Sequence, residues 1–379
     1  MKDNTLDIIH NTSRQPKLSV IIPLYNKAPY VRKALESVLA QTYTNFELIV
    51  VDDGSTDGSS EIAEQFIDER LKVKDSNNSI AETNAYNLSP INYKLIRQAN
   101  AGVAAARNNG VAQAQGDYLA FLDADDWWEP TYLEQMARLI EDYPDAGLYA
   151  CNYIYYKPGK TRIALNIPTG YINYPKAYYE SGAMPVTSIT AIMHRKVFNE
   201  MGGFPLGIKL GEDFLLWAKT AMHYPVAFCE DALAYYNNDV PVNLRATRNL
   251  HHPNNHMLFQ MELAFGDGKI VNQQHQQQKS TTFRANQPPC TAKEINLPTT
   301  EDWKRLIDKL RVNGLLEYWL SKDYHDQAAE ELKKVDWSKQ PESIKRIYKT
   351  PIWMLKAKRL IVRWGSVVKQ GLIKLRKKN

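Results

Sequence analysis

The sequence predicts an α/β fold with a mostly parallel central sheet, followed by a C-terminal helical region. Short apolar segments, such as 18–22, 46–51 and 118–122, alternate with segments of helical periodicity. This alternation is typical of parallel sheets whose strands are joined by helical crossovers. With 379 residues, of which 44% are hydrophobic, the chain is long enough for one large domain or two ordinary ones.

The first part of the chain carries the clearest alternation. The expected strands cover 18–22, 46–51 and 118–122, and an apolar segment at 93–98 precedes an Ala-rich helix. Ser59 or Ser60 is expected to cap the second helix at its start. The polar residues 72–92 show no period. The expected helices are 30–40, 59–70, 100–116 and 131–143.

The second part of the chain is expected to add further strands and helices. Two strands should surround the turn "KPGK" within 147–165, and a strand should lead into a helix over 187–198. Residues 265–300 are polar and Gln-rich and predict a linker or long loop. A helical pair is expected over 301–334, broken near Asn313–Gly314. The remaining expected elements are a helix at 212–222 and strands at 226–230 and 232–236.

Charge and cysteine content limit the function classes. The three cysteines, Cys151, Cys229 and Cys290, have no metal-like spacing, so we expect a reducing compartment without a disulfide framework. The first residues show no signal-peptide pattern, and no window is apolar enough to span a membrane. The net charge of +5 is concentrated in 350–379, which holds nine Lys and Arg and no acidic residue. The rest of the chain is net acidic and has no RNA-binding motif, which disfavours nucleic-acid binding.

The segment "YLAFLDADDWWEP", residues 118–130, places three carboxylates directly after a buried strand. Three such charges repel each other unless a cation offsets them. The Asp123-Ala124-Asp125 motif predicts a Mg²⁺ or Mn²⁺ site, because these ions prefer oxygen ligands and substrate phosphates. The alternative interpretation is a solvated loop, in which Asp126 caps the next helix.

Other polar residues follow strands or begin helices. Asp53, in "VVDDGSTDG", can accept a hydrogen bond from a nucleobase or can belong to a plain Asp-Gly turn. Tyr25 can stack on a base or be an ordinary loop aromatic. Arg107 lies in the Ala-rich helix, where it can point inward or face solvent. Glu212 and Asp213 open a helix, where they can favour its dipole or supply a general base.

Several nucleotide-binding and hydrolytic classes lack their motifs here. The sequence contains neither G-x-G-x-x-G nor a P-loop, which disfavours a Rossmann dehydrogenase or a P-loop nucleotidase. It has no H-E-x-x-H motif, and no Ser-His-Asp arrangement can be inferred.

The order of the motifs resembles that of the family-two inverting glycosyltransferases. The similar segments are "SVIIPLYNKAPYVRKALESVLAQTYTNFELIVVDDGSTDGS", "NAGVAAARNNG", "YLAFLDADDWWEP", "MHRKVFNEMGGF" and "GEDFLLWAK", within about residues 17–238. The resemblance implies the GT-A fold, in which a nucleotide-sugar-binding half joins an acceptor-binding half. The expected organisation is an extension at 1–16, a GT-A domain at 17–245, a polar linker at 246–300 and a helical region at 301–379.

The resemblance also implies roles for individual residues. Tyr25 and Asp53 would contact the nucleobase, with Pro23 and Asn26 in the same nucleotide-sugar site. Arg107 would lie near the nucleotide and Asp123 near the ribose. Asp125 would hold the metal ion, Asp213 would be the catalytic base, and Glu212 would support it.

One segment departs from the pattern of many relatives. They carry a Tyr-Arg-x-His-like segment after the last strands, where this chain reads "YYNNDVPVNLRATR". Arg245, Arg248 or His251 could take the place of the late histidine contact.

The implied reaction transfers a sugar, with inversion, from a nucleotide sugar to a glycan or lipid-linked hydroxyl. UDP is the expected nucleotide, and bacterial surface polysaccharide synthesis on the inner face of the cytoplasmic membrane is the expected setting. The alternatives are a sugar-1-phosphate nucleotidyltransferase, disfavoured because "PLYNKAP" has no Gly, and a non-catalytic glycan-binding descendant, expected to lack Asp125 or Asp213.

The basic C-terminal tail predicts an amphipathic helix. On a helical wheel, Trp353, Trp364 and several aliphatic residues gather on one face, and most Lys and Arg residues lie on the other. Such a helix suits the surface of an anionic membrane. The alternative is that its apolar face packs on 301–334 or on a partner subunit.

Overall fold

The structure is a computed structural model, and it describes residues 15–75, 92–241, 250–261, 264 and 297–356. Residues 1–14 of the expected extension at 1–16, Cys290, the Gln-rich stretch up to 296 and the tail from 357 lie outside these residues. The chain divides into two compact units, residues 1–303 and 304–379, and each is considered by itself.

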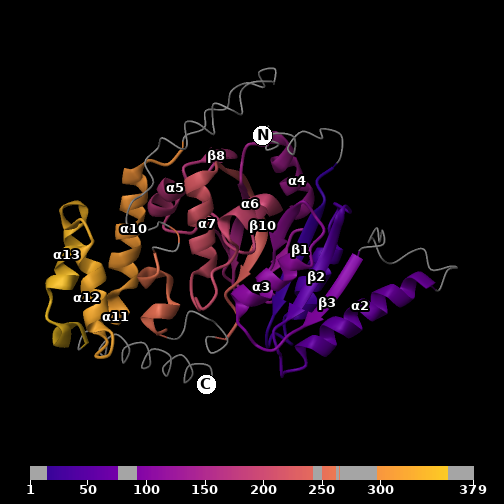
Figure 1. The fold of residues 1–379 in the computed structure, drawn as a ribbon, viewed down its shortest axis with the longest axis horizontal. Helices are drawn as coiled ribbons and strands as arrows, with labels where there is room; N and C mark the ends of the chain where they lie inside the picture. Colours follow the sequence, from indigo (N-terminus) through magenta and orange to yellow (C-terminus); the bar gives the residue numbers. More distant parts are fainter. Residues whose placement is uncertain (1–14, 76–91, 242–249, 262–263, 265–296, 357–379) are drawn as a thin grey trace, which may run out of the picture. The chain divides into compact units, whose positions relative to one another are not determined.

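The first unit contains a ten-stranded sheet in the order β3-β2-β1-β4-β9-β6-β10-β5 (Figure 1). Its first four strands are parallel, and β1 and β2 are buried along their whole length. Such continuous burial explains why these segments are apolar without alternation. The strands are β1 (Leu18–Leu24), β2 (Phe46–Asp52), β3 (Asn92–Arg97) and β4 (Tyr118–Phe121).

The other part of the sheet is mixed. Strand β9 (Ile192–His194) pairs antiparallel with both β4 and β6 (Leu148–Tyr156). Strand β10 (Val226–Asn237) runs parallel to β6 and antiparallel to β5 (Trp127–Trp128). The remaining strands are β7 (Arg162–Ile163), on β6, and β8 (Gly170–Ile172), on β10. The expected mostly parallel α/β sheet is therefore confirmed.

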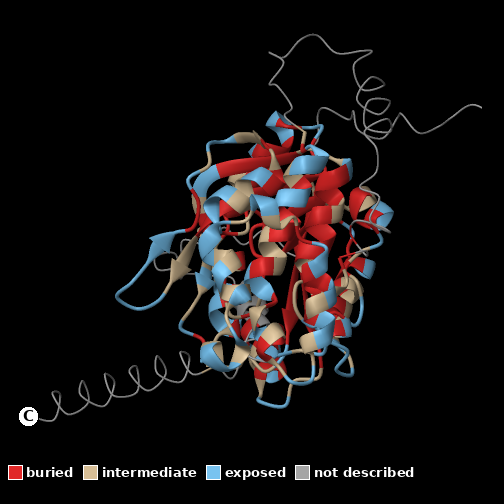
Figure 2. Cartoon of the chain, turned by 90° about the vertical axis from the view of Figure 1, so that its left-hand side faces the viewer, coloured by how far each residue is buried: buried red, intermediate tan, exposed pale blue. Residues whose placement is uncertain are grey.

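The helices of the first unit pack against this sheet. Buried residues of both the strands and the helices form the core (Figure 2). Helix α3 approaches β1 so closely that a Cβ atom at Gly110 would lie 2.6 Å from Ile21 Cγ2. A glycine at this position lets the helix carry its side chains toward the strand ends. The helices are α1 (Val31–Leu39), α2 (Ser59–Asp75), α3 (Val103–Ala112), α4 (Tyr132–Asp142), α5 (Tyr174–Ser181), α6 (Arg195–Met201) and α7 (Glu212–His223).

The second unit is helical. Its helices bury a small core of its own, to which Leu306, Leu315 and Leu332 belong. The expected helix break is confirmed, because α10 ends at Gly314 and α11 begins at Leu316. The elements are α10 (Thr300–Gly314), α11 (Leu316–Leu320), α12 (His325–Lys333), η5 (Trp337–Lys339) and α13 (Glu342–Lys349). Within the described residues, no helix has the length and apolarity needed to cross a membrane.

Some local expectations were wrong. The strands at 226–230 and 232–236 form one strand, β10, whose register against β6 shifts between Cys229 and Ala234. The cap assigned to Ser59 or Ser60 is also wrong, because α2 already begins at Ser59. Asp57 accepts a hydrogen bond from the Ser59 amide at 3.1 Å instead. The short elements β5, β8 and α5 were not predicted.

Candidate functional site

The loops that follow β1 and β2 are fastened together at the carboxyl ends of these neighbouring strands. The Asn26 amide donates to Ser55 Oγ at 3.0 Å, and the Thr56 amide donates to Asn26 Oδ1 at 2.9 Å. The Lys27 amide donates to Ser59 Oγ at 2.8 Å. Asn26 has a φ of 51°, in the left-handed region that asparagine tolerates better than most residues. Asn26 thus shapes the loop that carries Tyr25 and Lys27.

Asp53 fixes the residues that directly precede α3. Its carboxylate accepts hydrogen bonds from the backbone amides of Ala101 and Gly102, both at 2.8 Å, and from Gln98 Nε2 at 2.8 Å. Asp53 is only 3% exposed, whereas the nearby Tyr25 is 48% exposed. Pro23 lies within β1, opposite Val51 of β2. A flat aromatic surface is therefore available beside a fixed carboxylate.

Each carboxylate after β4 has its own partner. Asp123 Oδ1 accepts from Arg107 Nη2 at 2.7 Å, and Asp125 Oδ2 lies 2.5 Å from Lys27 Nζ. Asp126 Oδ1 accepts from the Asn237 amide at 2.7 Å, which ties this loop to the end of β10. Asp126 therefore does not cap the next helix as expected, and Thr131 occupies the N-cap position of α4.

Burial raises the pKa values of Asp125 and Asp126. Burial raises the pKa of Asp125, the Lys27 ammonium opposes the increase, and the charge of Asp123 adds to it. Burial and the neighbouring carboxylates raise the pKa of Asp126 well above its ordinary range. An additional cation beside this loop would stabilise the ionised forms.

Arg107 joins the acidic loop to the start of α7. Its side chain is 3% exposed, and its second terminal nitrogen, Nη1, donates to Glu212 Oε1 at 2.7 Å. One guanidinium thus bridges Asp123 and Glu212, which are 89 positions apart in the sequence. The inward orientation of Arg107, one of the two sequence interpretations, is the one that the structure has.

The Glu212–Asp213 pair lies at the first turn of α7, after Gly211. Burial and the charge of Asp213 raise the pKa of Glu212 to about 7, although Arg107 opposes this increase. Asp213 Oδ1 accepts from the Phe214 amide at 2.7 Å, and Oδ2 accepts from Ser188 Oγ at 3.1 Å. Burial also raises the pKa of Asp213. Both oxygens are thus oriented, and the proton affinity is increased, as a general base requires.

Tyrosine side chains from β6, α5 and β10 gather near these carboxylates. The rings of Tyr155 and Tyr236 lie 5.8 Å apart, and those of Tyr153 and Tyr155 lie 5.2 Å apart. Burial and the charge of Asp213 raise the pKa of Tyr178. Tyr236 is 36% exposed, and its pKa is raised by burial and then by the charges of Asp126, Asp123, Asp125 and Asp213. We call Tyr155, Tyr178 and Tyr236 the tyrosine group.

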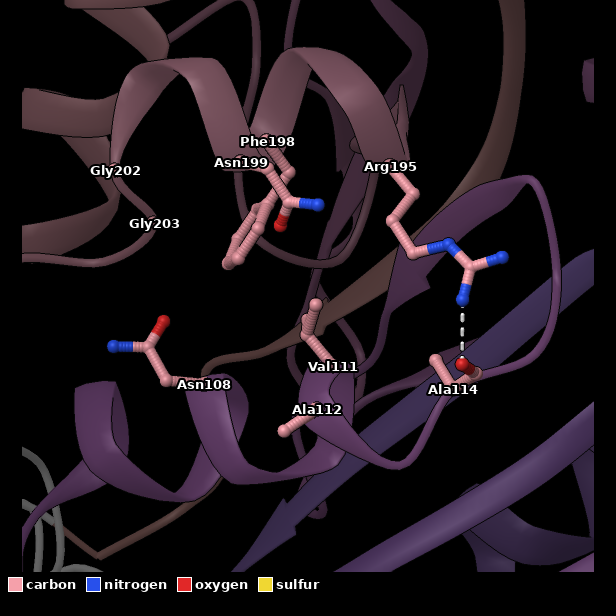
Figure 3. A pocket seen from close by; sticks show the side chains of 9 residues that line it. All are labelled: Asn108, Val111, Ala112, Ala114, Arg195, Phe198, Asn199, Gly202 and Gly203. Carbon is pink, nitrogen blue, oxygen red and sulfur yellow. Dashed lines mark hydrogen bonds between the residues drawn. The ribbon is translucent and has the colours of Figure 1, made fainter.

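A hollow of about 470 Å³ lies elsewhere, between α3 and α6 (Figure 3). Arg195 borders it and donates from Nη1 to the Ala114 carbonyl oxygen at 2.6 Å. None of the residues expected to bind nucleotide or metal lines this hollow. Its lining residues are Asn108, Val111, Ala112, Ala114, Arg195, Phe198, Asn199, Gly202 and Gly203.

The segment expected to replace the late histidine contact is only partly described. Arg245 and Arg248 lie outside the described residues, and His251 is half-buried. Burial, and then the charge of His251, lower the pKa of His256 to about 4. His256 forms a β-bridge with Leu210, just before α7. His256 was not among the site residues expected from the sequence.

The structure brings most of the expected site residues together. The loops carrying Asn26 and Asp53 join each other, and Arg107 joins Asp123 to Glu212. The side chains of Lys27 and Ser188 were missed, and only the expected proximity of the strand ends could have pointed to Lys27. These positions leave the proposed functions of the individual residues to be tested.

Comparisons with known proteins agree with the expected fold. Residues 19–202 match the model of glycosyl transferase family 2. The chain is 38% identical over 168 residues to the putative glycosyltransferase EpsH of Bacillus subtilis, covering 43% of this chain and 42% of that protein. It is also 38% identical over 131 residues to the putative teichuronic acid biosynthesis glycosyltransferase TuaG of Bacillus subtilis, covering 34% and 44%. The chain thus spans less than half of the length of these relatives.

A solved structure extends the comparison to most of the chain. The crystal structure of Staphylococcus aureus TarS residues 1–349 in complex with UDP-GlcNAc superposes with a TM-score of 0.57. The superposition covers 88% of this chain and 91% of the TarS 1–349 chain, at 19% sequence identity. At this identity the likeness shows the fold, and the expected GT-A fold is confirmed.

We predict that the stability of the Glu212→Gln variant relative to the original protein increases between pH 4.5 and 7. The pKa of Glu212 is about 7 in the folded protein and about 4.5 when unfolded. Because the folded value is raised, its contribution to stability is present below pH 4.5 and is lost as the pH rises through 7. Glutamine does not titrate, so the Tm of the variant minus the Tm of the original protein should rise across this window and then level off.

Thermal unfolding at a series of pH values measures this difference. Glu36→Gln, on the exposed side of α1, removes the same type of charge and is the control. A Tm difference for Glu212→Gln that stays constant from pH 4.5 to 7 would contradict the raised pKa.

Proposed function

We propose that the protein, whose residues 19–202 match the model of glycosyl transferase family 2, transfers a sugar from a nucleotide-diphosphate sugar to a hydroxyl group of a glycan or lipid-linked acceptor. The observation that carries the proposal is the Arg107 bridge between Asp123 and Glu212. It sets the expected donor-binding loop beside a pair of buried carboxylates. A displacement reaction needs a leaving group bound in a fixed position and a base near the attacking hydroxyl.

In this proposal, the nucleotide binds where the loops after β1 and β2 meet. Tyr25, with 48% of its surface exposed, stacks on the base, and Asp53 accepts from a base N–H. Pro23 and Asn26 shape the same loop, and Asp123 lies near the ribose. Asp53 already accepts hydrogen bonds from the amides of Ala101 and Gly102. It would therefore orient the base while it fixes the start of α3. The UDP-GlcNAc bound to TarS supports UDP as the nucleotide.

The residues after β4 fit a divalent metal held in part by phosphate oxygens. The described residues contain no group of three or more His, Cys, Asp or Glu side chains arranged around a common metal position. Asp125, whose carboxylate is partly exposed, suits Mg²⁺ or Mn²⁺, which commonly take one or two carboxylates and complete their coordination with water and substrate phosphates. When bound, the ion would neutralise charge on the leaving diphosphate.

We assign the base role to Asp213. Ser188 and the Phe214 amide orient the two oxygens of Asp213. Its pKa is raised toward the pH at which a general base works best. Asp213 accepts the proton of the acceptor hydroxyl as that oxygen attacks the anomeric carbon. The bond to the diphosphate breaks on the opposite side, so the anomeric configuration inverts. Glu212 supports Asp213 by keeping Arg107 beside the pair.

The tyrosine group supports a saccharide as the acceptor. An aromatic ring offers an apolar face for the C–H side of a sugar ring and a hydroxyl for hydrogen bonding. Tyr236 is partly exposed, and the charges of Asp125 and Asp213 both add to the effect of burial in raising its pKa, which favours a position for Tyr236 near the expected site. The similarity to TuaG, named for teichuronic acid biosynthesis, agrees with a role in bacterial surface polysaccharide synthesis.

We predict that Asp213→Asn lowers turnover by about 10²- to 10⁴-fold, the usual contribution of a general base, while donor affinity is retained. Turnover is measured as nucleoside diphosphate release from UDP-, GDP- and dTDP-sugars with Mg²⁺ or Mn²⁺. Binding is measured separately by calorimetry. Asp142→Asn, at an exposed position of α4, is the matched control.

Three results would overturn parts of this assignment. Near-normal kcat in Asp213→Asn would transfer the base role to Glu212. Absence of diphosphate release from every donor by the unaltered protein would reject glycosyl transfer itself. Thermal stabilisation by GDP and not by UDP would reject only the choice of nucleotide.

We also propose that the C-terminal tail attaches the enzyme to the inner face of the cytoplasmic membrane. Most of the tail, from residue 357, lies outside the described residues, and the support is its basic, Trp-containing sequence. At its described start, Trp353 is 68% exposed. Exposed tryptophan beside lysine and arginine is typical of helices that lie in a membrane interface. Attachment there would keep the site near lipid-linked acceptors.

The tail proposal predicts flotation of the full chain with vesicles that contain anionic lipid at low salt. Each Lys or Arg near such a surface contributes about 1 kcal/mol, so a chain ending at Lys349 should float much less. Vesicles of neutral lipid are the control. Equal flotation of both chains, or none, would contradict the proposal, and unfolding of the shortened chain would indicate that the tail packs on the protein.

A further inference from the structure

Lys27 occupies the position beside Asp125 in which a cation is expected. The Lys27 Nζ to Asp125 Oδ2 distance is 2.5 Å, and the two side chains are 18% and 20% exposed. The pair joins the loop after β1 to the loop after β4, 98 positions away. Asp123 has a different cation, Arg107, so the Lys27 ammonium is the positive group in direct contact with Asp125.

The backbone of Lys27 is held, and its side chain is the part that can move. The Lys27 amide is bonded to Ser59, and the next amide, of Ala28, donates to Asp57 Oδ2 at 3.0 Å. Its predecessor Asn26 is fixed from both sides by Ser55 and Thr56. A lysine has a flexible stem with a compact charge at its end, so its ammonium can change partners without a change in the loop.

A divalent ion on Asp125 would compete with the Lys27 ammonium for the charge of one carboxylate. The two cations would lie within a few ångströms of each other in a partly buried site, where like charges repel more strongly than in water. This repulsion favours departure of the ammonium from Asp125 when the ion enters. The nearest new anionic partner, in the proposed reaction, is the donor diphosphate, for which lysine is a common ligand.

We propose that Lys27 is an exchangeable counter-ion, which neutralises Asp125 before the donor arrives and moves to the donor diphosphate when a divalent metal takes its place. This assignment rests on the proposed function, because it uses a metal ion on Asp125 and a nucleoside diphosphate as ligand. Lys27 is a binding and positioning residue with two partners. It opposes metal binding to the empty site and favours nucleotide binding.

These two effects have opposite signs, which makes the role measurable. In Lys27→Met, Mn²⁺ added without nucleotide no longer competes with an ammonium, and its affinity should rise about tenfold. UDP added at saturating Mg²⁺ loses a cationic partner, and its affinity should fall about tenfold. Uridine, which has no phosphate, should bind both proteins equally. A tenfold change corresponds to about 1.4 kcal/mol.

The experiment titrates the full chain with Mn²⁺ alone by electron paramagnetic resonance, and with UDP or uridine at saturating Mg²⁺ by calorimetry. Lys157→Met removes the same charge from the exposed turn between β6 and β7 and should change neither affinity. Lys27→Arg keeps the cation and should restore both affinities toward those of the original protein. Circular dichroism establishes that each variant is folded.

The exchange is overturned if Lys27→Met and the original protein bind Mn²⁺ equally, or if neither binds it. It is also overturned if the loss of UDP affinity is matched by an equal loss for uridine, since that indicates a disturbed loop. Failure of the proposed function is a separate result, the absence of diphosphate release by the unaltered protein.

Discussion

The site depends on one buried cation, the guanidinium of Arg107. Taking this group out of water is unfavourable unless charged partners surround it, and here carboxylates lie 2.7 Å from two of its nitrogens. Removing one member of such a buried group typically costs about 3–5 kcal/mol, because the remaining charge is left unpaired. The bridge therefore fixes the distance between the loop after β4 and the start of α7. These two segments come from different halves of the sheet, and each supplies one part of the proposed chemistry.

The position of Arg107 follows from the packing of α3. Gly110 lets the helix lie against β1. Asp53 fixes the N-terminal end of the helix through the amides of Ala101 and Gly102. The side chain of Arg107 then extends past the ends of the strands, where it meets Asp123. The residues after β1, β2 and β4 thus act as one unit, since the loop of each strand is bonded to that of its neighbour.

The sequence was sufficient to predict the parallel strands, their helices and the segments that contain the site. The reason is physical, because a strand buried on both faces must be apolar, and polar residues directly after it must lie at the sheet edge. The inward orientation of Arg107 could only be left open, since an arginine in a helix usually faces solvent. Asp126 was misassigned to a helix cap because its true partner, the Asn237 amide, is more than 100 positions away. Strand β5 has two residues, and no periodicity can be recognised over that length.

The charges at the site also explain why a nucleotide diphosphate and a divalent ion would be expected together. Asp123, Asp125, Asp126, Glu212 and Asp213 lie within one electrostatic network, and Arg107 and Lys27 contact three of them. Burial first, and then the neighbouring carboxylates, raise the pKa values of Asp126 and Glu212 and so favour a bound proton. A diphosphate alone would add negative charge to this network and be repelled. A divalent ion on Asp125, with an ammonium freed from the same carboxylate, offsets both charges of the incoming group. The excess of carboxylates therefore disfavours the nucleotide alone and favours its entry together with a cation.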